Sequence, residues 1–161
     1  MALSIVPLAP SHKLGAFSCG NDEIDRYLHE HARNEHVRGV TAVHVAIDAS
    51  ETVQAFFTLS NLSIRTDPAL LAALQEAGWP YPVISGFLLG RLGRSTTLAG
   101  SAVGAAMLSR AIYIAQKQRV ASSGVFLAVD PKDEKWLVEW YERLNFVHLA
   151  PPSRRMIYSL L

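Results

Sequence analysis

The segment Leu98–Leu108, LAGSAVGAAML, joins a run of small residues to an apolar pattern with helical spacing. The first backbone N–H groups of a helix have no partner within it, and the aligned peptide dipoles place partial positive charge there. A phosphate can reach such N–H groups where the side chains are small. The same small residues would also allow a neighbouring element to pack closely, and the pattern by itself leaves both interpretations open.

Tyr141 is a second candidate, because its hydroxyl could act as a proton donor. A tyrosine with a pKa of about 10 is protonated at pH 7, and a departing thiolate with a conjugate-acid pKa of about 8.5 can accept its proton. Alternatively, Tyr141 packs in a core cluster with Trp136 and Trp140. The helical pattern alone favours core packing.

Histidine and cysteine residues give weaker signals. His29, His31 and His36 are close in the sequence, but residues two apart on a helix point in different directions, and no Cys or Asp completes a ligand set. We therefore expect no metal site. Cys19 precedes a helix, where a thiolate could be stabilised, although a buried thiol in the loop is the simpler interpretation.

The elements that must position these residues follow from hydrophobic periodicity and turn signals. Asn21 or Asp22 can cap the first helix. The glycines of the strand before Leu98 indicate a bulge or a group that approaches the backbone closely. The predicted strands are 3–8, 41–48, 53–64, 81–93, 123–130, 146–150 and 155–161, and the predicted helices are 19–36, 67–78, 98–118 and 131–145. This order predicts a mixed α/β layer fold.

Composition sets the broad class of protein. The 161 residues, of which 50% are hydrophobic, suffice for one domain over residues 1–161. The net charge of +1 is no signature for nucleic acid, so any basic site must be local. The single cysteine agrees with a reducing compartment, the N-terminus lacks the pattern of a signal peptide, and no window could span a bilayer. We expect a cytoplasmic protein with no membrane partner.

Four segments, in this order, resemble the GNAT-type acetyltransferases and, more narrowly, the TacT-like toxins that acetylate aminoacyl-tRNA. The segments are FSCGNDEIDRYL, VQAFFTLSNLSI, GFLLGRLGRSTTLAGSAVGAAML and EWYERLNF. The resemblance implies the GNAT acyl-CoA N-acyltransferase fold, in which helices flank a central mixed β-sheet.

The resemblance is incomplete at the acetyl-CoA loop, which usually reads Q/R-x-x-G-x-G/A. When Gly104 takes the last position, Ala99 stands in place of Gln or Arg, and Ala102 replaces the inner glycine. A register that begins at Thr97 restores the glycine with Gly100 but fits the following helix less well. One polar anchor is missing in either register.

The resemblance also implies roles for individual residues. The strand around Leu92, Gly93 and Arg94 would pair with the pantetheine arm of acetyl-CoA and point a backbone N–H at the thioester carbonyl. Tyr141 would protonate the departing thiolate. The residues that would hold the pyrophosphate are Leu98, Ala99, Gly100, Ser101, Ala102, Val103 and Gly104.

The predicted reaction is acetyl transfer to the α-amino group of aminoacyl-tRNA, by a toxin that blocks translation. An α-amine with a pKa of 7.7 to 8.0 is neutral in about a tenth of molecules at pH 7, so it can attack without a general base. Arg33, Arg38 and Arg91 would bind tRNA phosphates, although scattered arginines commonly form a solvated face.

Two alternatives stay open at this point. The chain could acetylate a small amine or a peptide N-terminus, or it could be a degenerate acyl-CoA-binding protein without turnover, as Ala99 and Ala102 would allow. The resemblance further implies a homodimer and a ribbon-helix-helix antitoxin as partners.

Overall fold

The computed structural model describes residues 2–65, 72, 76, 78, 81–149 and 153–161. The chain divides into two compact units, of which the first contains Met1–Ser60 and Leu89–Ile114 and the second contains Asn61–Leu88 and Ala115–Leu161. Apart from residues 72, 76 and 78, the helix expected at 67–78 lies outside the described residues. Across the described residues, no helix combines the length and the apolar character that a bilayer span requires.

The described strands form one seven-stranded sheet in the order β1-β2-β3-β4-β5-β7-β6. Strands β3 (Val53–Arg65) and β4 (Val83–Arg94) and helix α4 (Val103–Ser122) each contribute residues to both units. A mixed sheet flanked by helices is the predicted architecture, and it is confirmed.

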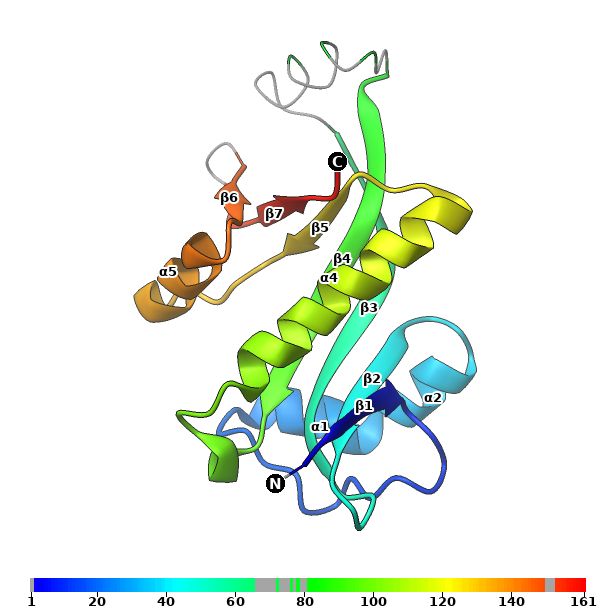
Figure 1. Cartoon of the computed structure of the whole chain (residues 1–161), viewed down its shortest axis with the longest axis vertical. Helices are drawn as coiled ribbons and strands as arrows, with labels where there is room; N and C mark the ends of the chain where they lie inside the picture. The colour runs from blue at the N-terminus through cyan, green and yellow to red at the C-terminus, as the bar shows by residue number, and fades with distance from the viewer. Residues whose placement is uncertain (1, 66–71, 73–75, 77, 79–80, 150–152) are drawn as a thin grey trace. The chain divides into compact units, whose positions relative to one another are not determined.

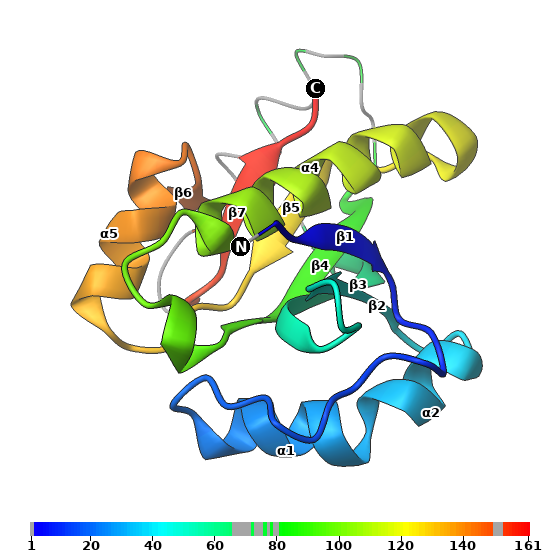
Figure 2. The ribbon, with the colours of Figure 1, turned by 60° about the horizontal axis from the view of Figure 1, so that its bottom comes forward.

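In the first unit, β1 (Ser4–Pro7) pairs antiparallel with β2 (Ala42–Ile47), which pairs antiparallel with β3. The carboxylate of Asp48 shapes the turn between β2 and β3, because its Oδ1 accepts hydrogen bonds from the N–H groups of Ser50 and Thr52 at 2.8 and 3.1 Å. In Figure 2, α1 (Asp22–Glu30) and α2 (Ala32–Val37) lie below these strands, and the first half of α4 lies above them.

The sequence predicts one helix within 19–36, capped at Asn21 or Asp22. That prediction is wrong in one respect, because the structure has two helices, α1 and α2, on either side of His31. Asn21 caps α1 as predicted, since its side chain accepts hydrogen bonds from the N–H groups of Glu23 and Ile24 at 3.1 and 3.2 Å. His31 leaves helical geometry with φ −121°, and Ala32 directly after it has no exposed surface. The break therefore allows the second helix to take its own path against the core of this unit.

In the second unit, β5 (Phe126–Val129) pairs antiparallel with β7 (Met156–Ser159), which pairs antiparallel with β6 (Val147–His148). Figure 1 shows these short strands beside one another and, next to them, α5 (Lys135–Arg143). All residues of β5 are buried, as its uninterrupted apolar sequence predicts. A core cluster of buried residues in this second unit contains Ile64, Ile84, Phe126, Ala128 and Ile157.

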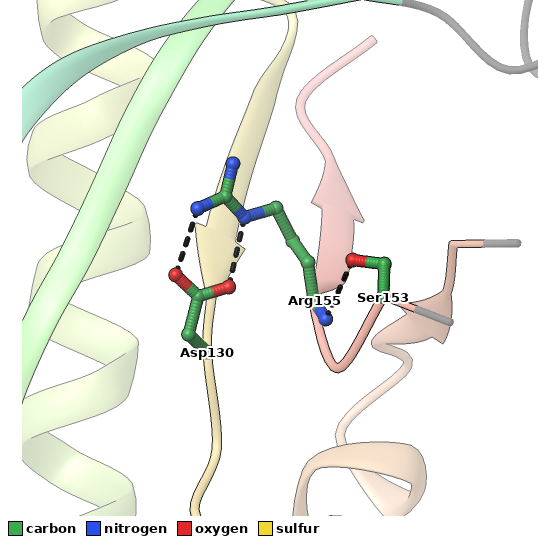
Figure 3. A network of polar contacts seen from close by, with 3 residues as sticks. All are labelled: Asp130, Ser153 and Arg155. Atoms are coloured by element: carbon green, nitrogen blue, oxygen red, sulfur yellow. Dashed lines mark hydrogen bonds and ion pairs between the residues drawn. The ribbon is translucent and has the colours of Figure 1, made fainter. Parts of the chain in front are cut away.

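A bidentate ion pair joins the residue after β5 to the residue before β7. The Nε and Nη2 atoms of Arg155 donate to the two carboxylate oxygens of Asp130 at 2.8 and 2.7 Å, and Ser153 Oγ accepts the N–H of Arg155 at 3.1 Å (Figure 3). The hydrogen bond to Asp130 raises the pKa of Arg155. Such fork-to-fork geometry fixes the spacing of the two strand ends.

Candidate functional site

The last part of β4 contains two glycines that protein atoms approach closely. A Cβ on Gly93 would lie 3.0 Å from a ring carbon of Phe56 and 3.1 Å from a methyl group of Ile24, and a Cβ on Gly90 would lie 3.0 Å from Thr58 Oγ1. The predicted close approach is therefore confirmed. The approaching groups are the core side chains of the first unit, so packing accounts for the absence of a side chain at these positions.

The loop from Ser95 to Ala102 leads from β4 into α4 and is anchored at its beginning. The N–H of Ser95 donates to Gln54 O at 2.8 Å, and the N–H of Thr96 donates to Ser18 O at 2.9 Å. A short 3-10 helix, η1 (Thr96–Leu98), follows. Helix α4 therefore begins at Val103 and ends at Ser122, whereas the sequence predicts a helix over 98–118. Both ends lie a few residues further along the chain than predicted.

The second half of this loop is open. Ala99 and Gly100 are exposed, and nothing lies within 4 Å of a Cβ built on Gly100. Gly100 has φ +78°, a left-handed conformation that residues with a Cβ adopt at a cost. Neighbouring protein therefore does not fill the turn, and of the two interpretations of this segment, close helix packing does not account for Gly100.

Several backbone N–H groups of the loop and the first turn of α4 have no acceptor among the described residues. Val103 N–H donates weakly to Ser101 Oγ at 3.4 Å, and Ala106 N–H donates to Ala102 O at 3.0 Å. The groups without an acceptor belong to Gly100, Ala102, Gly104 and Ala105. Amides at the positive end of a helix are a favourable place for an anion.

Arg94, the last residue of β4, supplies a cation directly before this loop. Its Nε atom is buried and finds no hydrogen-bond partner within the described ranges. Since successive side chains of a strand point to opposite faces, Arg94 lies on the face away from Phe56 and Ile24, which Gly93 meets. An unsatisfied buried donor is unfavourable, and the oxygen atoms of a diphosphate could satisfy it.

Tyr141 lies in α5 and belongs to the second unit, whereas the loop belongs to the first. It is 5% exposed and packs edge to face with Trp140 and Phe146, at centroid distances of 5.0 and 5.2 Å. The sequence offers the alternative that Tyr141 packs in a core cluster with Trp136 and Trp140. Tyr141 does pack against Trp140, but Trp136 is 64% exposed and is not a core residue. Burial raises the pKa of Tyr141, and its hydroxyl makes no hydrogen bond in the described structure. It is therefore a protonated donor at neutral pH.

The three arginines predicted to bind substrate have different surroundings in the first unit. Arg33 donates to the carbonyl oxygens of Ala9, Pro10 and His12, which gives it a structural role in holding the loop after β1. Arg38 is exposed just after α2. Arg91 stacks on the ring of Tyr27, with its Cζ 3.6 Å from the ring centroid. The sequence contains no signal for this last contact, because the two residues are distant along the chain.

Cys19 and the histidines make local structural contacts. Burial, and next the hydrogen bond to Asp25, raise the pKa of Cys19 to about 11, so it is a thiol at neutral pH and no nucleophile. His29 Nε2 lies 3.0 Å from Leu14 O, and His36 Nδ1 accepts the N–H of Val43 at 3.0 Å. Within the described ranges, no cluster of three or more metal-binding side chains occurs.

No protein-family model matches the chain. Solved structures of AtaT and KacT are similar to it. AtaT complexed with acetyl-methionyl-tRNAfMet is 20% identical, with 98% of this chain and 95% of that chain covered and a TM-score of 0.87. A tyrosine-to-phenylalanine mutant of KacT is 20% identical, with 99% and 96% covered and a TM-score of 0.87.

A tyrosine-to-phenylalanine mutant of the toxin AtaT, bound to the C-terminus of the antitoxin AtaR and acetyl-CoA, is 18% identical, with 99% and 94% of the chains covered and a TM-score of 0.82. Because the likeness extends over nearly the whole of each chain, the chain has the fold of these proteins. The predicted GNAT acyl-CoA N-acyltransferase fold is confirmed.

Proposed function

We propose that this protein is an acetyl-CoA-dependent N-acetyltransferase, and that it is a toxin that acetylates the α-amino group of aminoacyl-tRNA and blocks translation. The observation that carries the proposal is the open loop before α4, in which several N–H groups and the Nε of Arg94 have no hydrogen-bond partner among the described residues. The fold likeness to AtaT complexed with acetyl-methionyl-tRNAfMet supports the choice of substrate.

The residues present fit acetyl-CoA. The N–H groups of Gly100, Ala102 and Gly104 can bind the pyrophosphate, and neither Ala99 nor Ala102 blocks them because both side chains are small and exposed. We place Arg94 as the cation that compensates for the polar anchor missing at Ala99. The remaining loop residues Leu98, Ser101 and Val103 complete this segment, and the backbone of Leu92 and Gly93 would pair with the pantetheine arm.

When bound, acetyl-CoA supplies the acetyl group as a thioester. In the proposed reaction, the new C–N bond forms as the C–S bond breaks, and Tyr141 donates its hydroxyl proton to the departing sulfur. A tyrosine is protonated at neutral pH with its ordinary pKa, and burial raises the pKa of Tyr141 further, so the proton is present on the hydroxyl. An α-amine with a pKa of 7.7 to 8.0 is partly neutral at pH 7 and can attack without a strong base. Water takes up the proton that the amine loses and returns a proton to Tyr141, so the protein ends the reaction in its starting state.

One observation favours a less anionic acceptor, such as a small amine or a peptide N-terminus. The carbonyl oxygens around Pro10 engage Arg33, so fewer arginines are free for RNA than the sequence predicts. Arg38 and Arg91 remain as cations in the same unit without an anionic partner among the described residues.

The test is acetyl transfer by the purified protein from labelled acetyl-CoA to charged tRNA. Small amines and peptides run in parallel, and charged tRNA with a blocked α-amine is the control. We expect label on charged tRNA alone, and a rise in melting temperature with acetyl-CoA before any transfer. The absence of a thermal shift would contradict both enzymatic proposals, whereas label on small amines alone would overturn only the substrate.

We also infer the setting in which the toxin acts. One domain over residues 1–161 would carry the activity in the cytoplasm, as a homodimer neutralised by a ribbon-helix-helix antitoxin. The structure of an AtaT mutant bound to the C-terminus of AtaR supports an antitoxin partner. Growth arrest on expression, relieved by co-expression of the gene next to it, is the expected result.

A further inference from the structure

Arg91 is an exposed arginine held in one place. Its backbone N–H donates to Thr58 Oγ1 at 2.9 Å, and its guanidinium lies 3.6 Å from the centre of the Tyr27 ring. The guanidinium makes no hydrogen bond or ion pair with any described residue. One face of the cation is therefore covered by an aromatic ring, while the N–H groups along its edges face no protein acceptor.

The ring beneath Arg91 is itself fixed. Tyr27 is 4% exposed, and its hydroxyl donates to Glu35 Oε2 at 2.7 Å. Its ring stacks on Phe56, with centroids 6.3 Å apart and an interplanar angle of 17°. Tyr27 lies in α1 and Glu35 in α2, so this hydrogen bond bridges the break at His31. Two helices and a strand thus determine where the guanidinium lies.

The side chain of Arg91 lies on the face of β4 that meets α1, and not on the face that carries Arg94. Arg91 and Gly93 are two residues apart on β4 and share a face, on which they meet Tyr27 and Ile24 of α1 respectively. Arg94 lies on the other face, beside which the first half of α4 runs (Figure 2). The two arginines therefore lie on opposite faces of β4, and Arg91 faces α1 rather than the side on which α4 runs.

We propose that Tyr27 and Glu35 are a positioning pair that holds Arg91 to bind a phosphate of the acceptor, the phosphodiester next to its aminoacylated end. This inference rests on the proposed function. Arginine presents its donors in a planar fork that matches phosphate oxygens. A guanidinium stacked on an aromatic ring is partly dehydrated and loses less conformational entropy when it binds. Phosphate is favoured over base stacking because the free groups are the edge donors.

The test compares two acceptors that carry the same amine. Charged tRNA has the phosphodiester, whereas 3′-aminoacyl-adenosine has the same ester and no phosphate. For Arg91→Ala, we expect KM for charged tRNA to rise about tenfold to a hundredfold, the range for a lost charge-assisted bidentate contact. We expect kcat at saturation and KM for aminoacyl-adenosine to change less than about twofold. The slope of log Kd for tRNA against log salt concentration should decrease by about one, which corresponds to the loss of one phosphate contact.

Two further arginine variants distinguish the paired hydrogen bonds of the Arg91 guanidinium from the effect of positive charge alone. Arg91→Lys keeps the charge and should recover only part of the loss, because an ammonium cannot make the paired contact. Arg26→Ala removes a neighbouring exposed charge of α1 that contacts no aromatic ring, and it should raise KM by less than about twofold.

Variants of Tyr27 test the positioning role. Tyr27→Phe keeps the ring and loses only the bond to Glu35, and Glu35→Gln keeps an acceptor for the Tyr27 hydroxyl. Tyr27→Phe should therefore raise KM for charged tRNA by about threefold, whereas Glu35→Gln should leave it within about twofold of the wild-type value. Tyr27→Leu removes the stacking surface, and we expect a rise of about threefold to thirtyfold with kcat unchanged. Melting temperatures identify any variant that loses its fold, and Arg91→Ala remains decisive because Arg91 is exposed.

The outcomes separate the two proposals. If the wild-type protein neither binds nor acetylates charged tRNA, the proposed substrate is wrong and this inference with it. If the wild-type protein acetylates charged tRNA while Arg91→Ala keeps the same KM and the same salt dependence, only the phosphate contact is overturned. Equal losses with charged tRNA and aminoacyl-adenosine would also overturn it, because they would indicate a contact to the amine or the base.

Discussion

At the scale of single residues, Tyr141 combines two roles that the sequence presents as alternatives. Its ring packs against Trp140 and Phe146, and its hydroxyl has no hydrogen-bond partner in the described structure. The phenol is protonated at neutral pH in any case, and burial in the cluster raises its pKa further, so packing does not remove the proton. A buried aromatic and a proton donor are therefore compatible.

Tyr141→Phe tests the donor without disturbing the packing. We expect kcat for acetyl transfer to fall about 10² to 10⁴-fold, the usual contribution of a general acid, with the melting temperature and acetyl-CoA affinity nearly unchanged. Tyr158→Phe is the matched control, since Tyr158 lies 5.5 Å from Phe146 between ring centroids and has no assigned catalytic role. Full turnover by Tyr141→Phe would show that the thiolate takes its proton elsewhere.

Cys19 should be chemically inert in the folded protein. With a pKa of about 11, only about one thiol in 10⁴ is ionised at pH 7. We expect iodoacetamide to label native Cys19 far more slowly than the unfolded protein, and Cys19→Ser to keep the acetylation rate within about twofold. Rapid loss of activity on alkylation of the native protein would contradict this assignment.

At the scale of elements, the transition from β4 to α4 concentrates the features that can bind an anion. Hydrogen bonds to Gln54 and Ser18 hold the beginning of the loop, and its end remains open because Gly100 takes a left-handed conformation. The amide groups are thereby preorganised, so little conformational entropy is lost when a ligand binds.

Gly100→Ala should weaken acetyl-CoA binding about tenfold and destabilise the fold by about 1 kcal/mol, because a Cβ disfavours φ +78° by about this amount. Calorimetric titration with acetyl-CoA and urea unfolding measure the two effects. Gly15→Ala is the control, since Gly15 has an ordinary φ and open space around its Cβ. Unchanged affinity in Gly100→Ala would place the diphosphate elsewhere.

At the scale of the whole molecule, stability should depend on pH through His44. This side chain stacks on Phe57 with centroids 5.1 Å apart, and burial, helped by His36 and Arg110, lowers its pKa from 6.5 to about 4. The unfolded chain therefore binds more protons than the folded chain between these two pKa values. The contribution of His44 is fully present above about pH 6.5 and is lost as the pH falls toward 4.

The pKa shift of His44 corresponds to at most about 3 to 4 kcal/mol at about 1.36 kcal/mol per pKa unit, and partial exposure of the ring reduces this value. We expect the wild-type free energy of unfolding to fall between pH 7 and pH 4.5 by about 1 to 2 kcal/mol more than that of His44→Phe, which keeps the stack on Phe57. Urea unfolding at both pH values measures the difference. Parallel pH profiles for the two proteins would exclude His44 as the cause.

Interactions between residues close together in the chain allow many elements of this protein to be predicted from its sequence. Asn21 predicts the start of α1 because its side chain can bond only to N–H groups a few residues away. The apolar run at Phe126–Val129 predicts a buried strand, and Asp48 marks the turn before β3. The order of the strands and helices and the choice of fold follow from such local patterns, together with a resemblance spread over four segments.

Contacts between distant residues were decided only by the tertiary structure. The fold stacks Arg91 on Tyr27 and brings Arg33 to the loop after β1, although these residues are distant in the sequence. It also leaves Arg94 Nε without a hydrogen-bond partner in the part of the chain that the structure describes. Residue types and spacing predict that an arginine is present, but not whether its donors are occupied. That depends on which backbone and side-chain atoms the fold brings within hydrogen-bond distance, and hence on packing that no local sequence pattern specifies.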